Sequence, residues 1–304
     1  MPAYSMIIGS DGQDGLVLQE LLRLRNKNII KVNRSQIVID ECQQSVLLTE
    51  HSLKETINNF EVSEIYFLAS VSTPASEIKN LWSPGRYRED SNLIQLFLNI
   101  LDVVKSKSKM TKIFVASSAL IFGNPKLIPQ DEECLLAPTE NYGLFKSLMH
   151  SIIDYYQVNY KLHIVTGILY PHESKYRKSH YLFKKIINTA KSNEISPSRE
   201  IEISNMNYTR EWNCAYQVMG ACIDLMELDC YGNFVIGSGV QYTVGAACEI
   251  IFSHFGLDSK DYVVYKNSPL IERSPNLVAN PTKLKNKLGY VPDGDLELLI
   301  QRNY

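Results

Sequence analysis

The chain has 304 residues with 31 basic and 33 acidic side chains, and its net charge at neutral pH is −2. This length has room for one main domain and a smaller second one. The balanced charge gives no general attraction to nucleic acid or to anionic membranes. Since no apolar run approaches the ~18 residues of a membrane-spanning helix, we expect neither a nucleic-acid nor a membrane partner.

Six cysteines are scattered along the sequence without a CxxC pair or the spacing of metal ligands: Cys42, Cys134, Cys214, Cys222, Cys230 and Cys248. No signal peptide precedes the first predicted strand. These features favour a reducing, cytoplasmic location with buried or idle thiols, and they predict no metal site.

The N-terminal region has the pattern of a strand, a tight turn and a helix. Residues 4–8 are rich in β-compatible apolar side chains, glycine recurs at Gly9, Gly12 and Gly15, and an apolar-periodic run begins at Leu16. In a dinucleotide-binding turn the first glycine permits the bend, the second lets backbone N–H groups approach a pyrophosphate, and the third lets the helix pack close to the strand. The alternative is a surface turn that happens to contain three glycines, but its place directly after a buried-strand pattern favours the nucleotide site.

A second strand is predicted over residues 28–33, reached from the glycines by one helix. Binding sites for NAD place an acidic residue near the end of this strand to hold the ribose 2′-hydroxyl. This chain has Arg34 and Ser35 there instead. A guanidinium and a hydroxyl suit a 2′-phosphate, so the expected cofactor is NADP, with a solvated loop as the alternative for Arg34.

Two further buried strands are expected at residues 64–70 and 112–118, and both end in small or hydroxyl-bearing side chains. The first ends at Ala69 and Ser70, as a strand does where a cofactor lies against its carboxyl end. Between the two strands, residues 91–104 are apolar with a helical period and should cover the sheet.

A helix is predicted from Tyr142 to Tyr156, and within it Tyr142 and Lys146 are one turn apart on one face. An ammonium near a phenol favours the phenolate and lowers the phenol's pKa from about 10 toward the working pH. Because the chain contains 18 tyrosines, Tyr-x-x-x-Lys alone is a weak signal, and an exposed helix pair is the alternative. Ser118 at the end of the preceding strand strengthens the signal, since hydroxyl, phenol and ammonium together can hold a substrate alcohol or carbonyl beside a nicotinamide.

The glycine turn at residues 9–15, Ser118, Tyr142 and Lys146 together resemble the extended short-chain dehydrogenase/reductase (NAD-dependent epimerase/dehydratase) family, and within it the GDP-mannose 4,6-dehydratases. The turn is similar to their Gly-x-x-Gly-Gln-Asp-Gly motif. Two further stretches resemble their Gly-Ile-Leu-Phe-Asn-His-Glu-Ser and Arg-Asp-Trp motifs: residues 168–174 (ILYPHES) and residues 210–212 (REW). The resemblance covers nearly the whole chain.

The resemblance implies a role for each matched residue. Tyr142 would be the catalytic acid/base, Lys146 its pKa partner and ribose ligand, and Ser118 the hydroxyl that orients the C4 oxygen of the sugar. The implied cofactor-binding residues are Gly9, Gly12, Gln13, Asp14, Gly15, Arg34, Ser35, Ala69, Ser70, Lys146 and His172. The implied substrate-binding residues are Ser118, Glu173, Arg210 and Arg273. A bidentate guanidinium suits a diphosphate, but an ion pair is the alternative for both arginines. A packed structural role is the alternative for His172 and Glu173.

Three departures from the family pattern bear on function. The family glutamate that moves protons at C5 and C6 falls on Leu120, an aspartate near the adenine falls on Leu47, and Pro171 replaces an asparagine that touches the sugar nucleotide. The segment after Ser35 is also shorter than in the family, where it helps to build a tetramer. The resemblance therefore implies a homodimer, paired through two long helices.

The expected fold is α/β, a Rossmann-type doubly wound parallel sheet with a smaller C-terminal α/β substrate-binding domain. Residues 1–170, with parts of 205–250 returning to them, would form the NADP-binding domain, and residues 171–304 the substrate-binding domain. The expected function is NADP(H)-dependent hydride transfer at C4 of a nucleoside-diphosphate sugar, GDP-linked by resemblance, as a 4-ketoreductase, 4-epimerase or 4-dehydrogenase. Two alternatives stay open: a dehydratase-type lyase with a substitute base, and a catalytically inactive, cofactor-bound binding protein.

Overall fold

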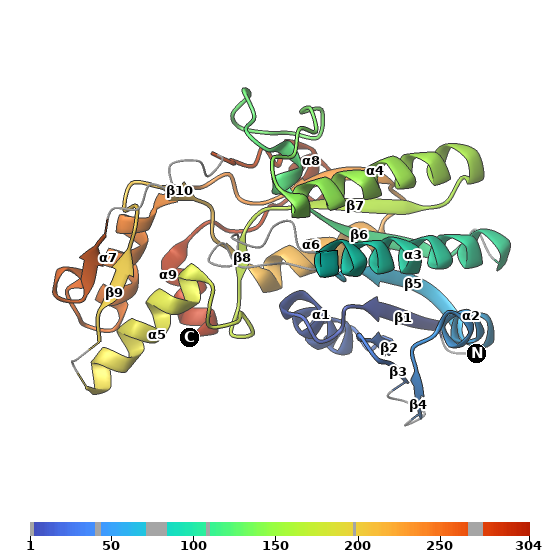
Figure 1. Cartoon of the computed structure of the whole chain (residues 1–304), viewed down its shortest axis with the longest axis horizontal. Coiled ribbons are helices and arrows are strands. Elements are labelled where there is room, and N and C mark those ends of the chain that lie inside the picture. The colour runs from blue at the N-terminus through green and yellow to red at the C-terminus, as the bar shows by residue number, and fades with distance from the viewer. Residues whose placement is uncertain (1–2, 40–43, 71–83, 108–109, 197–198, 267–275) are drawn as a thin grey trace. The chain divides into compact units, whose positions relative to one another are not determined.

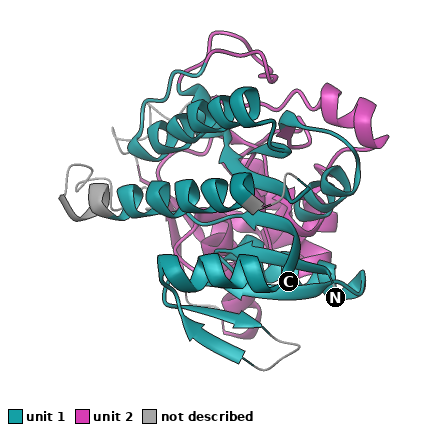
Figure 2. Cartoon of the chain, turned by 90° about the vertical axis from the view of Figure 1, so that its right-hand side faces the viewer, with its two compact units in different colours: residues 1–123, 136–169, 219–234 teal, residues 124–135, 170–218, 235–304 magenta. Residues whose placement is uncertain are grey.

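The computed structural model describes residues 3–39, 44–70, 84–107, 110–196, 199–266 and 276–304. The chain divides into two compact units. The first comprises residues 1–123, 136–169 and 219–234, and the second comprises residues 124–135, 170–218 and 235–304 (Figure 2). Arg273, which the resemblance assigns to the sugar nucleotide, lies outside the described residues.

An eight-stranded sheet forms the centre of the first unit (Figure 1). Its strands are β1 (Ala3–Ile8), β2 (Asn28–Val32), β3 (Gln36–Ile39), β4 (Gln44–Leu47), β5 (Glu61–Phe67), β6 (Lys112–Ser118), β7 (Ile164–Leu169) and β12 (Gly232–Ile236). Their spatial order is β12-β7-β6-β5-β1-β2-β3-β4. The strands from β2 through β1, β5 and β6 to β7 pair in parallel. Every residue of β7 is buried, as expected for a strand covered on both faces.

The order in which the chain adds strands changes direction at β1. It adds β2 on one side of β1 and later returns to add β5 on the other side. In doubly wound sheets, ligands bind at the carboxyl ends of the strands at such a switch point. This topology confirms the predicted Rossmann-type fold.

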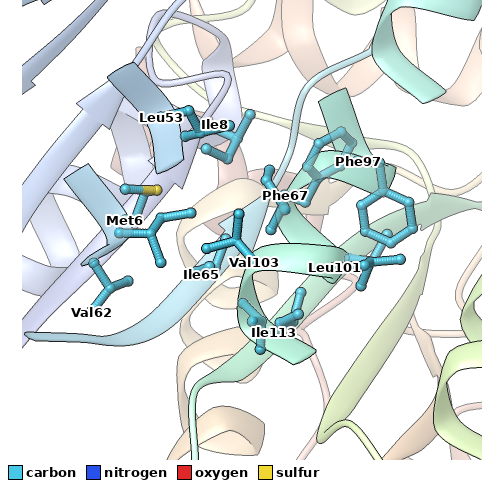
Figure 3. Packing of buried hydrophobic residues seen from close by; sticks show 14 of the residues in the cluster. Met6, Ile8, Leu53, Val62, Ile65, Phe67, Phe97, Leu101, Val103 and Ile113 are labelled. Carbon is cyan, nitrogen blue, oxygen red and sulfur yellow. The ribbon is translucent and has the colours of Figure 1, made fainter. Parts of the chain in front are cut away.

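Three helices cover one face of the sheet: α2 (Glu50–Asn59), α3 (Pro84–Lys107) and α4 (Asn141–Tyr160). Their apolar side chains recur at helical spacing and pack on the strands in one buried cluster (Figure 3). The rings of Phe67 in β5 and Phe97 in α3 lie 4.9 Å apart at its centre. Burial of each such side chain contributes about 1.5–3 kcal/mol, which holds these helices on the sheet.

Two helices belong to the opposite face: α1 (Gln13–Leu24) and α6 (Ala215–Glu227). Arg25, directly after α1, forms ion pairs with Asp224 at 2.6 Å and Glu227 at 3.1 Å. Lys112 at the start of β6 donates to the carbonyl of Met226 at 2.9 Å. These contacts link α6 both to α1 and to the sheet.

The second unit has short strand pairs and a core of its own. Its strands are β8 (His172–Glu173), β9 (Ile201–Ile203), β10 (Thr209–Arg210), β11 (Asn213–Cys214), β13 (Tyr242–Thr243) and β14 (Val263–Tyr265). Its helices are α5 (Leu182–Ile195), α7 (Val244–His254), α8 (Thr282–Leu288) and α9 (Leu296–Asn303). Phe183, Trp212 and Phe252 are buried in its core. The pairs are β8 with β11, β9 with β14 and β10 with β13.

Several element boundaries differ from the sequence prediction. Residues 36–39, where the sequence analysis predicts no strand, form β3, and β4 pairs with it in an antiparallel extension of the sheet. Ile37 and Ile39 alternate into the core, and this period of two is too short to stand out in the sequence. The helix predicted over 91–104 extends over 84–107. Among the described residues, no helix combines the length and the apolar composition that crossing a membrane requires.

Candidate active site

The glycine turn follows β1 directly and is closed by backbone contacts. Gly9 has φ +94, and a Cβ there would lie 2.8 Å from the backbone nitrogen of Ala69. A Cβ on Gly15 would lie 2.4 Å from the carbonyl oxygen of Gly9. Only glycine fits either position. The structure therefore brings the end of β1, the start of α1 and the end of β5 together, as the sequence predicted.

Gly12 differs from the other two glycines because its Cβ position is open. The nearest atom to a Cβ there is the Gly9 oxygen at 3.5 Å, and Gly12 is exposed. It is also the N-cap of α1, without a side-chain hydrogen bond to the helix. A helix N-terminus attracts anions, and a cradle that a methyl group would fill fits a close-lying pyrophosphate. Gln13 and Asp14 begin the helix, with the Gln13 amide donating to the Asp14 carboxylate at 3.2 Å.

Two alanine variants should separate folding from binding in this turn. Gly15→Ala should lower the free energy of unfolding by about 1–3 kcal/mol, because its Cβ collides with the backbone. Gly12→Ala should leave that free energy within about 0.5 kcal/mol of wild type. Both should weaken NADPH binding, which denaturant titrations and NADPH fluorescence would measure. A Gly12→Ala protein that binds NADPH as wild type does would contradict the placement of the pyrophosphate at Gly12.

Arg34 and Ser35 lie exposed at the tip of the turn between β2 and β3. The turn is shaped by Asn33, whose Oδ1 accepts hydrogen bonds from the Ser35 amide at 3.0 Å, the Ser35 hydroxyl at 3.3 Å and the Gln36 amide at 2.9 Å. Such an Asx turn presents the two following side chains outward. Sequence reasoning passed over Asn33, although asparagine between a strand and a polar pair is a turn signal. Ala69 and Ser70 are half-buried at the end of β5.

Tyr142, Lys146 and Ser118 meet where α4 packs against the end of β6. The Lys146 Nζ donates to the carbonyl of Ala116 at 2.6 Å and lies 5.8 Å from the centre of the Tyr142 ring. A Cβ on Gly143 would lie only 2.4 Å from the Leu120 carbonyl oxygen, so the first turn of α4 touches the backbone just after Ser118. The Ser118 hydroxyl accepts a hydrogen bond from the Leu120 amide at 3.3 Å.

The Lys146 ammonium is fully enclosed, which is unusual for lysine. Burial lowers the pKa of Lys146 to about 8, against the opposing attraction of Asp14 and Asp90. A buried positive charge one helical turn from a phenol favours the phenolate, as the sequence analysis expects for an acid/base pair.

Behind this lysine, the Ser117 hydroxyl and the His150 Nε2 share a buried hydrogen bond of 2.7 Å. Burial and the neighbouring Lys146 charge lower the pKa of His150 to about 4, so this imidazole is neutral at ordinary pH. Sequence reasoning missed both residues. The spacing of four from Lys146 to His150 was the available signal, because it places the histidine on the same helical face.

In the second unit, His172 and Glu173 form β8 and are buried. The His172 Nδ1 shares a hydrogen bond of 2.7 Å with the Tyr170 carbonyl. Glu173 holds the guanidinium of Arg177 at 2.9 Å, and Arg177 also donates to the His172 carbonyl. Arg210 in β10 is half-buried, with its guanidinium carbon 5.4 Å from the centre of the Tyr208 ring.

Glu211, the neighbour of Arg210, is a further residue whose role sequence reasoning missed. It is fully buried, and its carboxylate accepts hydrogen bonds from the backbone amides of Ala279, Ser238 and Gly239. Burial raises the pKa of this carboxyl although these amides stabilise its charged form. Glu211 therefore ties together three chain segments within the second unit.

A sequence model of the GDP-mannose 4,6 dehydratase family matches residues 6–303. The chain belongs to this family. GDP-mannose 4,6 dehydratase 2 of Caenorhabditis elegans is 25% identical to it over 95% of this chain and 84% of the relative. The GDP-mannose 4,6 dehydratase of Homo sapiens is 25% identical over 83% of this chain and 72% of the relative. The resemblance that the motifs predicted is confirmed.

Solved structures of nucleotide-sugar enzymes share the fold of this GDP-mannose 4,6-dehydratase family member. UDP-glucose 4-epimerase of Thermotoga maritima, solved with UDP-glucose, superposes with a TM-score of 0.81 at 18% identity and covers 98% of each chain. dTDP-glucose 4,6-dehydratase of Bacillus anthracis, solved in complex with NAD, has a TM-score of 0.79 at 17% identity, covering 99% of this chain and 96% of that one. At these identities the likeness concerns the fold.

Two carboxylates of this family member, Glu132 and Glu173, have partners in the second unit. The Glu132 carboxylate accepts a hydrogen bond from the Val235 amide at 2.7 Å, and burial raises the pKa of Glu132. Glu173 is paired with Arg177. Leu120 itself is half-buried in the short 3-10 turn 119–122.

Proposed function

We propose that this chain transfers hydride between NADP(H) and C4 of a nucleoside-diphosphate sugar, as a 4-ketoreductase, 4-epimerase or 4-dehydrogenase. The observation that carries the proposal is the Lys146 ammonium, enclosed between Tyr142 and the Ala116 carbonyl beside Ser118. Burying a charged lysine costs free energy, and its hydrogen bond to the neutral Ala116 carbonyl does not balance the charge with an opposite one. A site for acid/base chemistry explains why this position carries a charge.

The residues present fit a nicotinamide dinucleotide. In this proposal the turn around Gly12 and the N-terminus of α1 hold the pyrophosphate, Arg34 and Ser35 hold the 2′-phosphate, and Ala69 and Ser70 line the strand end beside it. Lys146 would hydrogen-bond the ribose. When bound, the nicotinamide supplies the hydride acceptor or donor. The parallel strands β1, β5 and β6 end at one edge of the sheet, which supports a common site for these residues at that edge.

Three side chains of this chain would act on the sugar. The Ser118 hydroxyl hydrogen-bonds the C4 oxygen and orients it. The Tyr142 phenol exchanges a proton with that oxygen, and the Lys146 charge makes its phenolate form accessible near neutral pH. Proton transfer by a positioned side chain accelerates such a step by about 10²- to 10⁴-fold.

The family match favours a GDP-linked sugar as substrate. We assign the cofactor to residues 1–170, with parts of 205–250, and the sugar nucleotide to residues 171–304. There Arg210 would pair with the diphosphate and Glu173 with the sugar, while His172 would reach the cofactor. Arg273 would be a second diphosphate ligand.

Two other functions compete with this one. A dehydratase-type lyase would need another base in place of Leu120. A catalytically inactive binding protein would retain cofactor without turnover. Mass spectrometry of the ligands that remain on the purified protein, followed by incubation with NADPH and 4-keto sugar nucleotides, distinguishes the proposed activity from the binding protein, and water loss from GDP-mannose tests the lyase. The proposal expects NADP(H) on the protein and a two-hydrogen mass gain in the sugar, whereas bound NADP(H) without turnover indicates the binding protein.

NADPH should bind this protein more tightly than NADH, and Arg34→Ala should reduce the ratio of the two affinities by roughly 10- to 100-fold. A charge-assisted hydrogen bond to a 2′-phosphate contributes about 1.5–3 kcal/mol, and only NADPH carries that group. Fluorescence titrations with both nucleotides measure the ratio, with Lys54→Ala, an exposed cation on α2, as the control. Equal or reversed affinities for NADPH and NADH in the wild type would contradict the assignment of Arg34 and Ser35 to the 2′-phosphate.

We also predict a homodimer paired through the apolar runs 93–104 and 144–156. Leu144, Leu148 and Tyr155 are about half exposed on α4, at spacings of one or two turns, which forms an apolar stripe. Leu148→Glu should produce monomers in light scattering at micromolar concentration. Leu24→Glu, at an exposed leucine on α1, should stay dimeric. A wild-type tetramer or monomer contradicts the prediction.

A further inference from the structure

Three consecutive residues at the end of β6 each use a polar group toward a different partner. The Ala116 carbonyl accepts from the Lys146 ammonium at 2.6 Å. The Ser117 hydroxyl shares a hydrogen bond of 2.7 Å with the His150 Nε2. The Ser118 hydroxyl accepts from the Leu120 amide at 3.3 Å.

On the facing helix, the matching residues are spaced by four. Tyr142, Lys146 and His150 therefore lie in one row along α4, each one turn beyond the last. Lys146 and His150 each make a hydrogen bond to β6, to neighbouring residues of the strand. Two bonds one turn apart fix both the rotation of α4 and its position along the strand, whereas one bond would fix neither.

We propose that Ser117 and His150 form a positioning pair that holds the Lys146 ammonium against the Ala116 carbonyl and beside Tyr142. The proposal deepens the proposed function, on which it rests, by extending its acid/base machinery to two residues that do not touch substrate. The pair acts through Lys146 alone.

The pair is buried, and burial makes its hydrogen-bond geometry strict. Ser117 and His150 are each 4% exposed, and Lys146 is 1% exposed. A buried polar group that loses its hydrogen-bond partner costs free energy, so neighbouring atoms must shift or water must enter. Either response would change the contact between Lys146 and Ala116.

The charge state of the pair also suits this role. A neutral imidazole adds no second positive charge beside Lys146, and burial together with that lysine lowers the pKa of His150 to about 4. The acidic groups that act on Lys146 from the described elements around it are Asp14 in α1 and Asp90 in α3. Both stabilise the ammonium, so the lowered lysine pKa depends on enclosure, which the pair maintains.

The test is the titration of Lys146 by NMR of lysine labelled at Cε, in the protein without nucleotide, with Lys146→Arg used to assign the signal. Wild type should titrate near pH 8. In His150→Leu and in Ser117→Ala, entry of water should raise the Lys146 pKa by one unit or more and weaken NADPH binding about tenfold. His150→Gln, whose amide can still bond Ser117, should restore values close to wild type.

The control is Tyr156→Phe, which removes a hydrogen bond of 2.8 Å from α4 to Asp102 of α3 but leaves the contact with β6 intact. It should lower the melting temperature without moving the Lys146 titration. The double variant Ser117→Ala/His150→Leu should shift that titration no further than either single variant, since both remove one bond.

A Lys146 titration unchanged in both single variants, or shifted equally in Tyr156→Phe, overturns the proposal. If His150→Leu does not fold, Ser117→Ala and His150→Gln still test the proposal. Ser117→Ala removes only one oxygen atom, and His150→Gln keeps a polar side chain of similar size. Failure of wild type to bind NADPH would instead refute the proposed function, while the lysine titration would still test the pair.

Discussion

Tyr142→Phe should lower the rate of hydride transfer by about 10²- to 10⁴-fold while leaving NADPH affinity within a few-fold of wild type. The phenol is the only group in our mechanism that exchanges a proton with the C4 oxygen, and its ring is half-buried next to Lys146. Removing one oxygen keeps the ring and its packing. Stopped-flow loss of NADPH absorbance with a panel of 4-keto sugar nucleotides measures the step.

Lys146→Met should reduce the same rate and should also change stability in a defined direction. Burial lowers the pKa of Lys146 to about 8 from an ordinary 10.5. Between these two pH values the unfolded chain binds more protons than the folded one, so the stability of wild type rises with pH across that window. Below pH 8 the full cost of burying the charge is present, and above pH 10.5 it has vanished.

The methionine variant should therefore be more stable than wild type at pH 7, and the difference should shrink as pH rises from 8 to 10.5. Urea titrations at several pH values would show this. Because the proposed mechanism needs the protonated Lys146, the rate of hydride transfer by the wild type should decline above about pH 8. A Lys146→Met enzyme with ordinary turnover, or with lower stability at every pH, would refute this account of the lysine. Lys161→Met, at an exposed lysine after α4, is the control and should change neither turnover nor the pH dependence of stability.

The second large effect concerns dehydration: this protein should not convert GDP-mannose to its 4-keto-6-deoxy product at an ordinary enzymatic rate. Dehydration removes hydride from C4, takes a proton from C5 and expels water from C6. In the proposed mechanism Tyr142 serves the first step, but the other two steps need a positioned carboxyl group. Leu120 can neither accept nor donate a proton, and loss of a general acid/base costs about 10²- to 10⁴-fold, or roughly 3–5 kcal/mol of barrier.

Restoring a carboxylate provides the complementary experiment. Leu120→Glu should raise the rate of water loss from GDP-mannose by one order of magnitude or more, and Leu120→Gln, which matches its size without the acid, should not. Mass spectrometry after incubation with GDP-mannose and NADP detects the product. Rapid dehydration by the wild type would show that another residue acts as base, and Glu132→Gln and Glu173→Gln would then locate it.

Much of the fold and of the candidate site was predictable because it depends on neighbours in the sequence. The turn from Gly9 to Gly15 follows a buried strand, and the contacts of 2.8 Å and 2.4 Å that a Cβ would make explain why those two positions are glycine. Tyr142 and Lys146 share a helical face because an α-helix repeats every 3.6 residues. Local periodicity determines the shared helical face and the position of the turn, whereas the close approach of Ala69 to Gly9 depends on a distant segment.

Other features arise only when distant segments pack together. Nothing near Lys146 in the sequence says that its ammonium is enclosed, since burial comes from β6, 30 residues away. The bond between Ser117 and His150, 33 residues apart, has the same origin. From the sequence alone Glu211 resembles a surface acid, but in the structure the backbone amides of Ser238 and Ala279 donate hydrogen bonds to its buried carboxylate.

By itself, the sequence determined the Rossmann-type fold class through its glycine turn and buried strands, together with the candidate acid/base pair Tyr142 and Lys146. Only the tertiary structure decided the burial that lowers the pKa of Lys146, the hydrogen bond between His150 and Ser117, and the pairing of Glu132 and Glu173 with structural partners. The physical reason is that hydrogen-bond geometry along the backbone depends on adjacent residues. Desolvation and charge pairing instead depend on what the folded chain brings within a few ångströms.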